Sequence, residues 1–282
     1  MLTAAIGSLI IVAIVTASTL WNYKKTAAAT DEAVSTVSSF YLLTMADSHA
    51  KTITNLISNS FEEMRIAIAY IADEDVASQY DLREAIGRVE SLLGMNQFAL
   101  VDEDNVVYTR YTTYTGGTRH AFLSKDSLDD RIISIVSIYG SSKQLCLAVP
   151  TPDLHIMGKQ YKACFVQFDI NDIFDLLALD EHAGTHFALY SKNGSNLSGT
   201  NLGPVISSGN LFEALQGVVP EEIWEENHEN FEKGEEGTLL FGTGDAHQTL
   251  CYVPIEGTEW EMAALIRESI IGSDTLHQRQ KP

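Results

Sequence analysis

The sequence is poor in basic residues and in cysteine. Its 282 residues include 18 Lys and Arg against 38 Asp and Glu, which gives a formal net charge of −20. A surface this negative disfavours binding to nucleic acid or to anionic membranes through charge, so we expect no nucleic-acid partner. The three cysteines form no Cys-x-x-Cys pair, which disfavours a zinc ribbon or a thioredoxin-type site, and their odd number argues against a disulfide-built secreted scaffold.

The common catalytic motifs are also missing. There is no Gly-x-Ser-x-Gly elbow, no His-Glu-x-x-His motif and no P-loop. His182 and His186 have the spacing of metal ligands on a helix, but they flank a loop-like AGT, so a loop is the favoured interpretation. GTGDAH at 242–247 suits a hairpin turn better than a phosphate loop, and His228 suits a solvated acidic helix face. We therefore expect no enzyme activity, no metal and no cofactor.

The longest uncharged segment lies at the N-terminus. Leu2 to Leu20 contains no charged residue, and about 20 such residues cross a bilayer. A signal peptide is the alternative, but no basic residue precedes the segment and no clear cleavage site precedes Trp21. We predict one uncleaved transmembrane helix within residues 1–25. The pair Lys24-Lys25 that follows favours a cytoplasmic location for the rest of the chain.

Residues 26–72 contain no Pro and no Gly, so neither residue interrupts a helix there. Apolar residues recur at steps of three or four, which predicts an amphipathic helix of about 70 Å. The apolar stripe predicts packing on the following domain, and the length suits a rod that carries a mechanical signal from a membrane span. The predicted stripe consists of Val34, Val37, Tyr41, Met45, Ile53, Leu56, Ile57, Met64, Ile68 and Ile71.

A mixed pattern of helices and strands follows the long helix. Gly94 ends a predicted short helix, and residues 131–139 suit either a helix or a strand. Residues 114–130 are polar and irregular. The other predicted elements are helices at 81–93 and 171–179, and strands at 98–101, 106–111, 143–150 and 160–170.

Cys146 and Cys164 lie in the last two of these strands. If the hairpin between the strands is centred near His155, each cysteine is nine residues from the centre, and the two would face each other. Opposed Cβ atoms lie about 4.5–5.5 Å apart, which is near disulfide reach. The alternative, which we favour, is two small buried hydrophobic residues.

The order of these motifs repeats later in the chain. FALVDEDNVVYT (98–109) is echoed by FALYSKNGSNLS (187–198), and LCLAVP (145–150) by LCYVP (250–254). Each second echo leads through a Gly-containing turn into a strand with an aromatic residue near its start. Such a repeat predicts a duplicated α+β unit, with the first copy at 73–180, the second at 181–271 and a tail at 272–282. In the second copy we expect strands at 187–190, 196–197, 237–242, 248–254 and 259–266, and an acidic helical run ending at Glu236.

A hairpin, a helical middle and three antiparallel strands form the ground plan of a PAS-like fold. A long helix before two such units resembles the double Cache family of bacterial sensor domains, over about residues 26–271. The helix, FALVDEDNVVYT, ACFVQFDINDIFDLL and WEMAALIRES carry the resemblance. It implies an α+β chain with a long N-terminal helix and two tandem PAS-like antiparallel-sheet units, preceded by one transmembrane helix. It also places both units outside the cytoplasmic membrane, and we follow it in preference to the Lys24-Lys25 signal.

The resemblance implies an extracytoplasmic small-molecule-sensing domain of a membrane-bound signalling protein of the histidine kinase, diguanylate cyclase or chemoreceptor type. The sequence holds no second span and no output domain, so any catalytic output is expected outside this chain, in a longer protein or a partner. We expect a homodimer along the long helix, and ligand binding that favours one of two packings of the units and the helix. The alternatives are a cell-surface binding module without inward signalling and a secreted hydrolase with an unrecognised site.

The predicted ligand site lies in the first unit, because PAS-like pockets form between the sheet and the segments that cover one face. Arg can hold a carboxylate with two hydrogen bonds, and Tyr adds a rigid wall. The candidate ligand-binding residues are Tyr108, Arg110, Tyr111, Tyr114, Arg119, Tyr139 and Asp169.

In amino-acid-binding members of the family, a carboxylate at the position of Asp169 pairs with the ligand's ammonium group. Those members also carry an Arg-x-Trp pair, whereas Tyr111 and Thr112 follow Arg110 here. The ligand class therefore stays open between amino acids, amines and carboxylates. Asp169 also suits a helix N-cap, and the tyrosines suit an ordinary strand surface.

Overall fold

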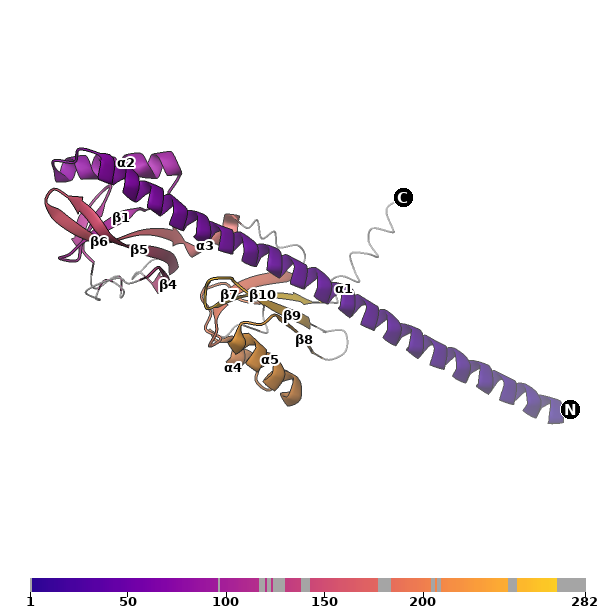
Figure 1. The fold of residues 1–282 in the computed structure, drawn as a ribbon. Helices are drawn as coiled ribbons and strands as arrows, with labels where there is room; N and C mark the ends of the chain where they lie inside the picture. Colours follow the sequence, from indigo (N-terminus) through magenta and orange to yellow (C-terminus); the bar gives the residue numbers. More distant parts are fainter. Residues whose placement is uncertain are drawn as a thin grey trace, which may run out of the picture.

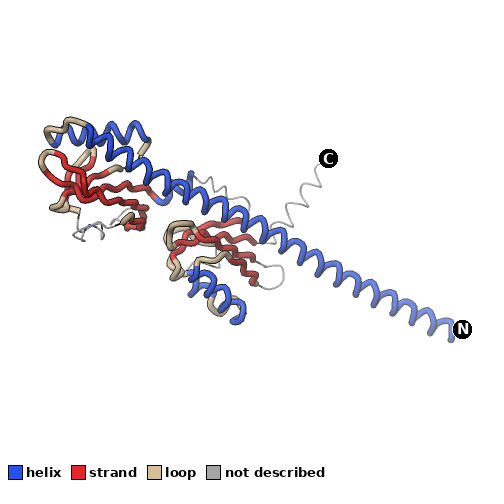
Figure 2. Tube along the Cα trace, in the orientation of Figure 1, coloured by secondary structure: helices blue, strands red, loops and turns tan. Residues whose placement is uncertain are grey.

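The computed structural model describes residues 2–95, 97–116, 120, 123, 130–137, 143–176, 184–203, 206, 209–242 and 248–267. One long helix, α1 (Leu2–Asp73), leads into two antiparallel sheets that both pack against it (Figure 1, Figure 2). This arrangement confirms the predicted α+β class with a long N-terminal helix.

Helix α1 is continuous over its 72 residues. Ile53, Met64 and Ile71 are buried, as the predicted stripe required, but Val37 is 68% exposed and Tyr41 45% exposed. Leu42, Ala46 and Ala50 are buried in this part of the helix instead. The buried face of this part of α1 therefore differs from the predicted stripe, and Leu42, Ala46 and Ala50 keep the four-residue spacing of one helix face.

The predicted membrane segment forms the first part of α1. Among the helices of the described residues, none combines the length and the apolar character needed to cross a membrane.

The first unit contains a six-stranded sheet in the order β3-β2-β1-β6-β5-β4. One prediction is corrected here, because part of the stretch predicted to be irregular forms β3. The segment at 131–139, for which helix and strand were both open, contains strand β4. The elements are α2 (Gln79–Leu93), β1 (Ala99–Asp102), β2 (Val106–Thr109), β3 (Thr113–Thr115), β4 (Ile132–Ser137), β5 (Lys143–Ile156), β6 (Lys159–Asp169) and α3 (Ile170–Leu176).

The second unit contains a four-stranded sheet in the order β7-β10-β9-β8. Its elements are β7 (Thr185–Ser191), α4 (Leu211–Leu215), α5 (Glu221–Lys233), β8 (Gly237–Phe241), β9 (Gln248–Pro254) and β10 (Trp260–Arg267). An isolated bridge joins Asn196 to Tyr190 of β7, where β2 pairs with β1 in the first unit. The two sheets therefore share one strand order, as the sequence repeat predicted, while the unit boundaries stay predictions.

The two faces of each sheet have different surroundings. The faces toward α1 belong to one hydrophobic cluster that also contains α2. Helices α4 and α5 lie on the far face of the second sheet (Figure 1). Their residues Leu211, Leu215 and Phe231 belong to the hydrophobic cluster on that face. On the far face of the first sheet, the described cluster holds no helix residue: it consists of Ala99, Val101, Val107, Leu123, Cys146, Ala148, Ala163 and Phe165.

The two cysteines of the first unit do not face each other. The β5–β6 hairpin turns at Met157 and Gly158, and its register shifts between Pro150 and Leu154. As a result, Cys146 pairs with Gln167 and Cys164 with Val149. Cys146 lies on the far face and Cys164 on the α1 face. The prediction that they share one face was therefore wrong, because the hairpin is not centred on His155. Both thiols are free and buried, which confirms the favoured interpretation as small hydrophobic residues.

Candidate functional site

A cavity of about 500 Å³ lies at the edge of the far face of the first sheet. Strands β1, β2 and β6 form its floor, the end of α2 forms one wall, and the segment from Arg110 to Tyr114 forms another. The lining residues are Glu90, Ser91, Met95, Gln97, Ala99, Thr109, Arg110, Tyr111, Thr112, Tyr114, His120, Phe165 and Gln167. The volume lies within the range of about 300–1,000 Å³ that is typical of small-molecule sites.

Arg110 is the arginine among the described residues that line this cavity. Its guanidinium carbon lies 5.3 Å from the centre of the Tyr111 ring, a distance at which a cation–π interaction forms. Its side chain passes over Gly87 of α2, where a Cβ would lie 3.1 Å from Nε and 3.2 Å from Cδ. Glycine at this position therefore makes room for the arginine.

Glu90 brings a carboxyl group to the same cavity. Its side chain is 10% exposed, and Oε2 lies 3.9 Å from Nη1 of Arg110, which is an ion pair without a hydrogen bond. Oε1 accepts a hydrogen bond from the backbone N–H of Phe98. Burial raises the pKa of the Glu90 carboxyl, although the Phe98 N–H and Arg110 oppose this shift.

Gln167 places an amide group on the floor of the cavity. Side chains alternate along β6, so Gln167 shares the far face with Phe165, while Cys164 and Val166 face α1. Gln167 is only 5% exposed, and its Nε2 has no hydrogen-bond partner among the described residues. His120 lies nearby, with its ring 4.7 Å from that of Phe165. Gln167 therefore contributes to the cavity lining, while its Nε2 is itself buried.

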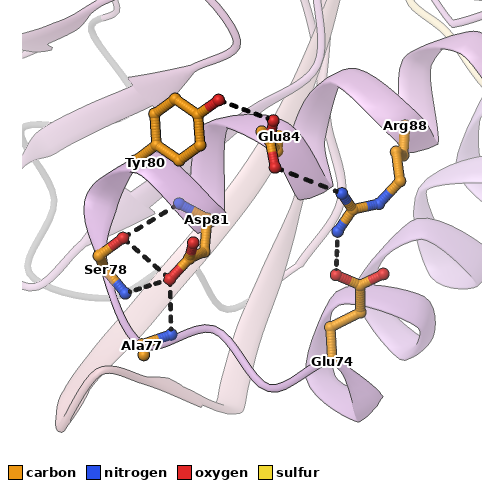
Figure 3. Close-up of polar contacts among 7 residues, drawn as sticks. All are labelled: Glu74, Ala77, Ser78, Tyr80, Asp81, Glu84 and Arg88. Carbon is orange, nitrogen blue, oxygen red and sulfur yellow. Dashed lines mark hydrogen bonds and ion pairs between the residues drawn. The ribbon is translucent and has the colours of Figure 1, made fainter.

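The start of α2 is fixed by a capping box (Figure 3). Ser78 Oγ accepts a hydrogen bond from the Asp81 N–H, and Asp81 accepts in return from the Ser78 N–H at 2.8 Å. Arg88 of α2 also donates a hydrogen bond to Glu74 at the end of α1. These contacts tie α2, and with it Gly87 and Glu90, to the long helix.

A larger groove, of about 710 Å³, lies along the outer side of α2 and shares Arg110 with the cavity. Two other arginines that line it are already engaged: Arg83 donates to Thr113 Oγ1 at 3.1 Å, and Arg88 to Glu74. We favour the smaller cavity as the ligand site, because it lies against the sheet and combines Arg110 and Glu90 with apolar residues such as Ala99 and Phe165.

The structure brings Arg110, Tyr111 and Tyr114 together in the lining of the cavity. It places Tyr108 elsewhere, because Tyr108 pairs with Leu100 and shares that residue's α1 face. The Tyr108 hydroxyl donates to Asp102 at 2.9 Å, inside the core. Tyr108 was predicted to share one face of the sheet with the other candidate ligand-binding residues. This position was wrong, because Tyr108 lies on the α1 face.

Asp169 is not among the described residues that line the cavity. Its Oδ1 accepts a hydrogen bond from the backbone N–H of Asn171 at the start of α3, which agrees with the capping interpretation. Arg119 and Tyr139 lie outside the described residues. The ligand-binding role of the predicted residues stays a prediction.

Sequence reasoning missed Glu90 and Gln167. Gln167 lies two residues before Asp169 on one strand, so the period-two alternation of β6 was the available signal. Glu90 gave no such signal, because only the packing of α2 brings it to the cavity.

The histidines set aside in the sequence have different surroundings. His228 was expected on a solvated helix face, but its ring lies 5.1 Å from Trp224 and 4.3 Å from Phe212, in an aromatic cluster. His186 lies beside Gly203, whereas His182 and most of GTGDAH lie outside the described residues.

Three solved structures are similar to this chain over most of its length. The ligand-binding domain of the amino acid chemoreceptor PctB of Pseudomonas aeruginosa PAO1, in complex with L-Gln, has a TM-score of 0.54 and 15% identity, covering 86% of this chain and 99% of that chain. The periplasmic sensory domain of the Campylobacter jejuni chemoreceptor Tlp1 has a TM-score of 0.56 and 11% identity, covering 85% and 98%. The chain has the fold of these sensor domains.

The extracellular domain of soHK1S-Z6, described as a histidine kinase, has the same fold, with a TM-score of 0.57 and 9% identity, covering 86% of this chain and 99% of that chain. The predicted resemblance to double Cache sensor domains is thus confirmed at the level of fold. No protein-family model and no curated protein sequence matches the chain.

Proposed function

We propose that this chain is an extracytoplasmic sensor domain of a membrane-bound signalling protein and that it binds a small molecule in the first-unit cavity. The observation that carries the proposal is the cavity itself, which combines the guanidinium of Arg110 and the carboxyl of Glu90 with apolar walls. The likeness to PctB with L-Gln and to the periplasmic domain of Tlp1 supports both the ligand site and the location.

The signal would leave the cavity through helices. Glu90 and Ser91 of α2 line the cavity, and α2 packs against α1 through Leu82, Ile86 and other buried residues. A ligand that shifts α2 would change its packing on α1. Because α1 also carries the second sheet, a change in the first unit can reach the whole length of the helix.

The membrane anchor and the output belong to the same proposal. The uncharged segment from Leu2 to Leu20 would anchor the chain, with both sheets outside the cytoplasm. The chain would itself be non-catalytic, and a kinase, cyclase or chemoreceptor output would be supplied by a longer protein or a partner.

A homodimer along α1 is the proposed assembly. Val37, Phe40 and Tyr41 are exposed at 68%, 73% and 45% and lie within one turn of each other. Exposed apolar residues that cluster on one part of a helix suit a helix–helix contact.

A thermal-shift screen of the full chain tests the ligand site. The screen covers amino acids, amines, carboxylates, nucleosides and divalent cations. We expect at least one organic ligand to raise the Tm of the wild type and to lose this effect in Arg110→Ala. Arg65→Ala is the matched control, since Arg65 is exposed on α1 and bonds only to Glu62 among the described residues. A ligand effect that survives Arg110→Ala would contradict the proposed site.

A further inference from the structure

We propose that the protonation state of Glu261 controls whether α5 stays packed on the second sheet. While the carboxyl keeps its proton, α5 stays closed over the sheet; when the proton is lost, α5 opens and the strands stay paired. This switch lies in the second unit, so it does not depend on a ligand in the first-unit cavity. It makes pH a separate input to a sheet that also packs on α1.

Glu261 lies in the middle of the second sheet and faces its helices. Strand β10 has β7 on one side and β9 on the other, and Glu261 pairs with Tyr190 and Pro254. Trp260 and Met262 belong to the cluster that contains α1, so by alternation Glu261 faces the far side, where α4 and α5 pack. The residue is fully buried there, and neither carboxyl oxygen has a hydrogen-bond partner among the described residues.

The carboxyl of Glu261 reaches the C-terminal end of α5. Gly234 caps this end in the left-handed conformation. A Cβ at Gly234 would lie 3.7 Å from Oε1 of Glu261 and 3.9 Å from Cε of Lys192. Because the C-terminal end of a helix carries a partial negative charge, an ionised Glu261 is repelled by the helix that covers it.

The charged groups near Glu261 compensate an ionised carboxyl poorly. Burial raises the pKa of Glu261 to about 8, and the positive charge of Lys192 opposes this shift. Burial also raises the pKa of the Tyr252 hydroxyl, and the charges of Glu261, Glu226 and Glu235 add to that shift. Two further carboxyl groups thus lie in the same surroundings as the single lysine, so an ionised Glu261 gains stability mainly from water.

Helix α5 is held less firmly than the strands. Strand β10 is hydrogen-bonded to a neighbour along both edges, whereas α5 is held on the sheet by side chains. Phe231 packs 5.0 Å from the ring of Tyr252, whose hydroxyl donates to Asn227. Six of the 13 residues of α5 are Glu and one is Lys, and its N-cap Pro220 makes no side-chain hydrogen bond. Opening of α5 therefore hydrates Glu261 at lower cost than separation of the strands.

Opening of α5 becomes more favourable as pH rises. In the open form Glu261 is hydrated and loses its proton near its ordinary pKa of 4.5, whereas the closed form keeps the proton to about pH 8. The opening equilibrium therefore grows between these two values, by up to about tenfold per pH unit, and levels off above the higher one.

Amide hydrogen exchange of the full chain between pH 5 and pH 8 tests the switch. Wild type and Glu261→Gln are compared at each pH, so that intrinsic exchange rates cancel. We expect equal exchange in α5 at pH 5 and at least tenfold faster exchange in the wild type at pH 8, with β9 and β10 better protected than α5 throughout. Glu256→Gln makes the same chemical change at an exposed position between β9 and β10, and is expected to behave as the wild type.

Lys192→Met tests the charge itself. Removing this cation raises the pKa of Glu261 in the closed form, so the opening equilibrium continues to grow above pH 8. We expect α5 of this variant to exchange severalfold faster than the wild type at pH 9. Combined with Glu261→Gln, Lys192→Met is expected to have no effect on α5, because the ionisable partner is gone.

Two results would overturn the proposal. Equal exchange of α5 in wild type and Glu261→Gln at pH 8 would show that Glu261 does not control the helix. Exchange of α5 and β10 at the same rate at every pH would show that the whole unit unfolds and that α5 does not open alone. If Glu261→Gln does not fold, the comparison of wild type with Lys192→Met at pH 9 decides, and equal rates there contradict the switch.

Discussion

Glu261 is a buried carboxyl group in the second unit. It lies on β10, is fully buried, and neither of its oxygens has a hydrogen-bond partner among the described residues. A Cβ at Gly234 would lie 3.7 Å from its Oε1, so the carboxyl reaches the C-terminal end of α5. Burial raises the pKa of Glu261 to about 8, although the positive charge of Lys192 opposes this. At neutral pH the folded protein therefore holds this carboxyl mainly in its neutral form.

This pKa predicts how stability depends on pH. An unfolded Glu loses its proton near pH 4.5, whereas the folded chain keeps it to about pH 8, so the stability contributed by this group falls as pH rises between these values. The total loss is of the order of a few kcal/mol. Glu261→Gln is expected to flatten the decline and to raise the Tm at pH 8. Thermal unfolding between pH 5 and pH 9 measures this, and parallel curves for variant and wild type would contradict it.

The variant Tyr108→Phe tests whether a residue that lies in the core also contributes to ligand binding. Its hydroxyl donates to Asp102, which also accepts from Lys159 at 3.1 Å. Tyr108→Phe removes one buried hydrogen bond and is expected to lower the unfolding free energy by about 1 kcal/mol without changing ligand affinity. Denaturant unfolding and calorimetry measure the two effects. If the variant loses affinity while its stability is unchanged, Tyr108 has a role in ligand binding and the prediction is contradicted.

At the scale of elements, α2 links the cavity to the long helix. Its capping box fixes one end, and its Gly87 leaves the space that the Arg110 side chain occupies. Glycine lowers helix stability by about 1 kcal/mol relative to alanine, so its presence in the middle of α2 is explained better by the contact with Arg110 than by the helix.

Gly87→Ala separates these two effects. The new Cβ would lie 3.1 to 3.3 Å from Arg110, whose side chain must shift by a few tenths of an ångström or more. We expect affinity for the ligand to fall severalfold while the Tm stays the same or rises. Calorimetry and thermal unfolding of one preparation measure both. Unchanged affinity would show that ligand binding does not depend on the path of the Arg110 side chain over Gly87.

The sequence predicted most helices and strands of the fold, but not always the face of the sheet on which a residue lies. The long helix, the strand order implied by the repeat and the end of α2 at Gly94 follow from periodicity and turn residues. The β5–β6 register did not follow, because the turn uses Met157 at a φ of 54°, a conformation that a methionine seldom adopts. The faces of Cys146 and Cys164 were wrong for this reason.

The candidate site was predictable only in part, because a cavity is made by residues distant in sequence. Arg110, Tyr111 and Tyr114 lie in one polar segment and could be identified together. Glu90 comes from a helix whose packing no local pattern reveals. Gln167 drew no attention because glutamine is usually an exposed residue, and only its burial marks it.

At the scale of the whole molecule, one helix carries both sheets. A single hydrophobic cluster runs from α2 and the first sheet along α1 to the second sheet. The ring of His49 of α1 lies 4.8 Å from that of Phe187, and the backbone carbonyl of Ser39 of α1 accepts a hydrogen bond from Cys251. From the N-terminus, α1 reaches the second sheet before the first (Figure 1).

The central claim is that a ligand in the first-unit cavity acts on α1 through α2. Amide hydrogen exchange of the full chain, measured with and without a saturating ligand from the screen, tests it most directly. The account predicts slower exchange in α2 and in the adjoining end of α1, and no such protection in Arg110→Ala under the same conditions. Protection confined to the second unit, or ligand binding that leaves α2 unchanged, would contradict it.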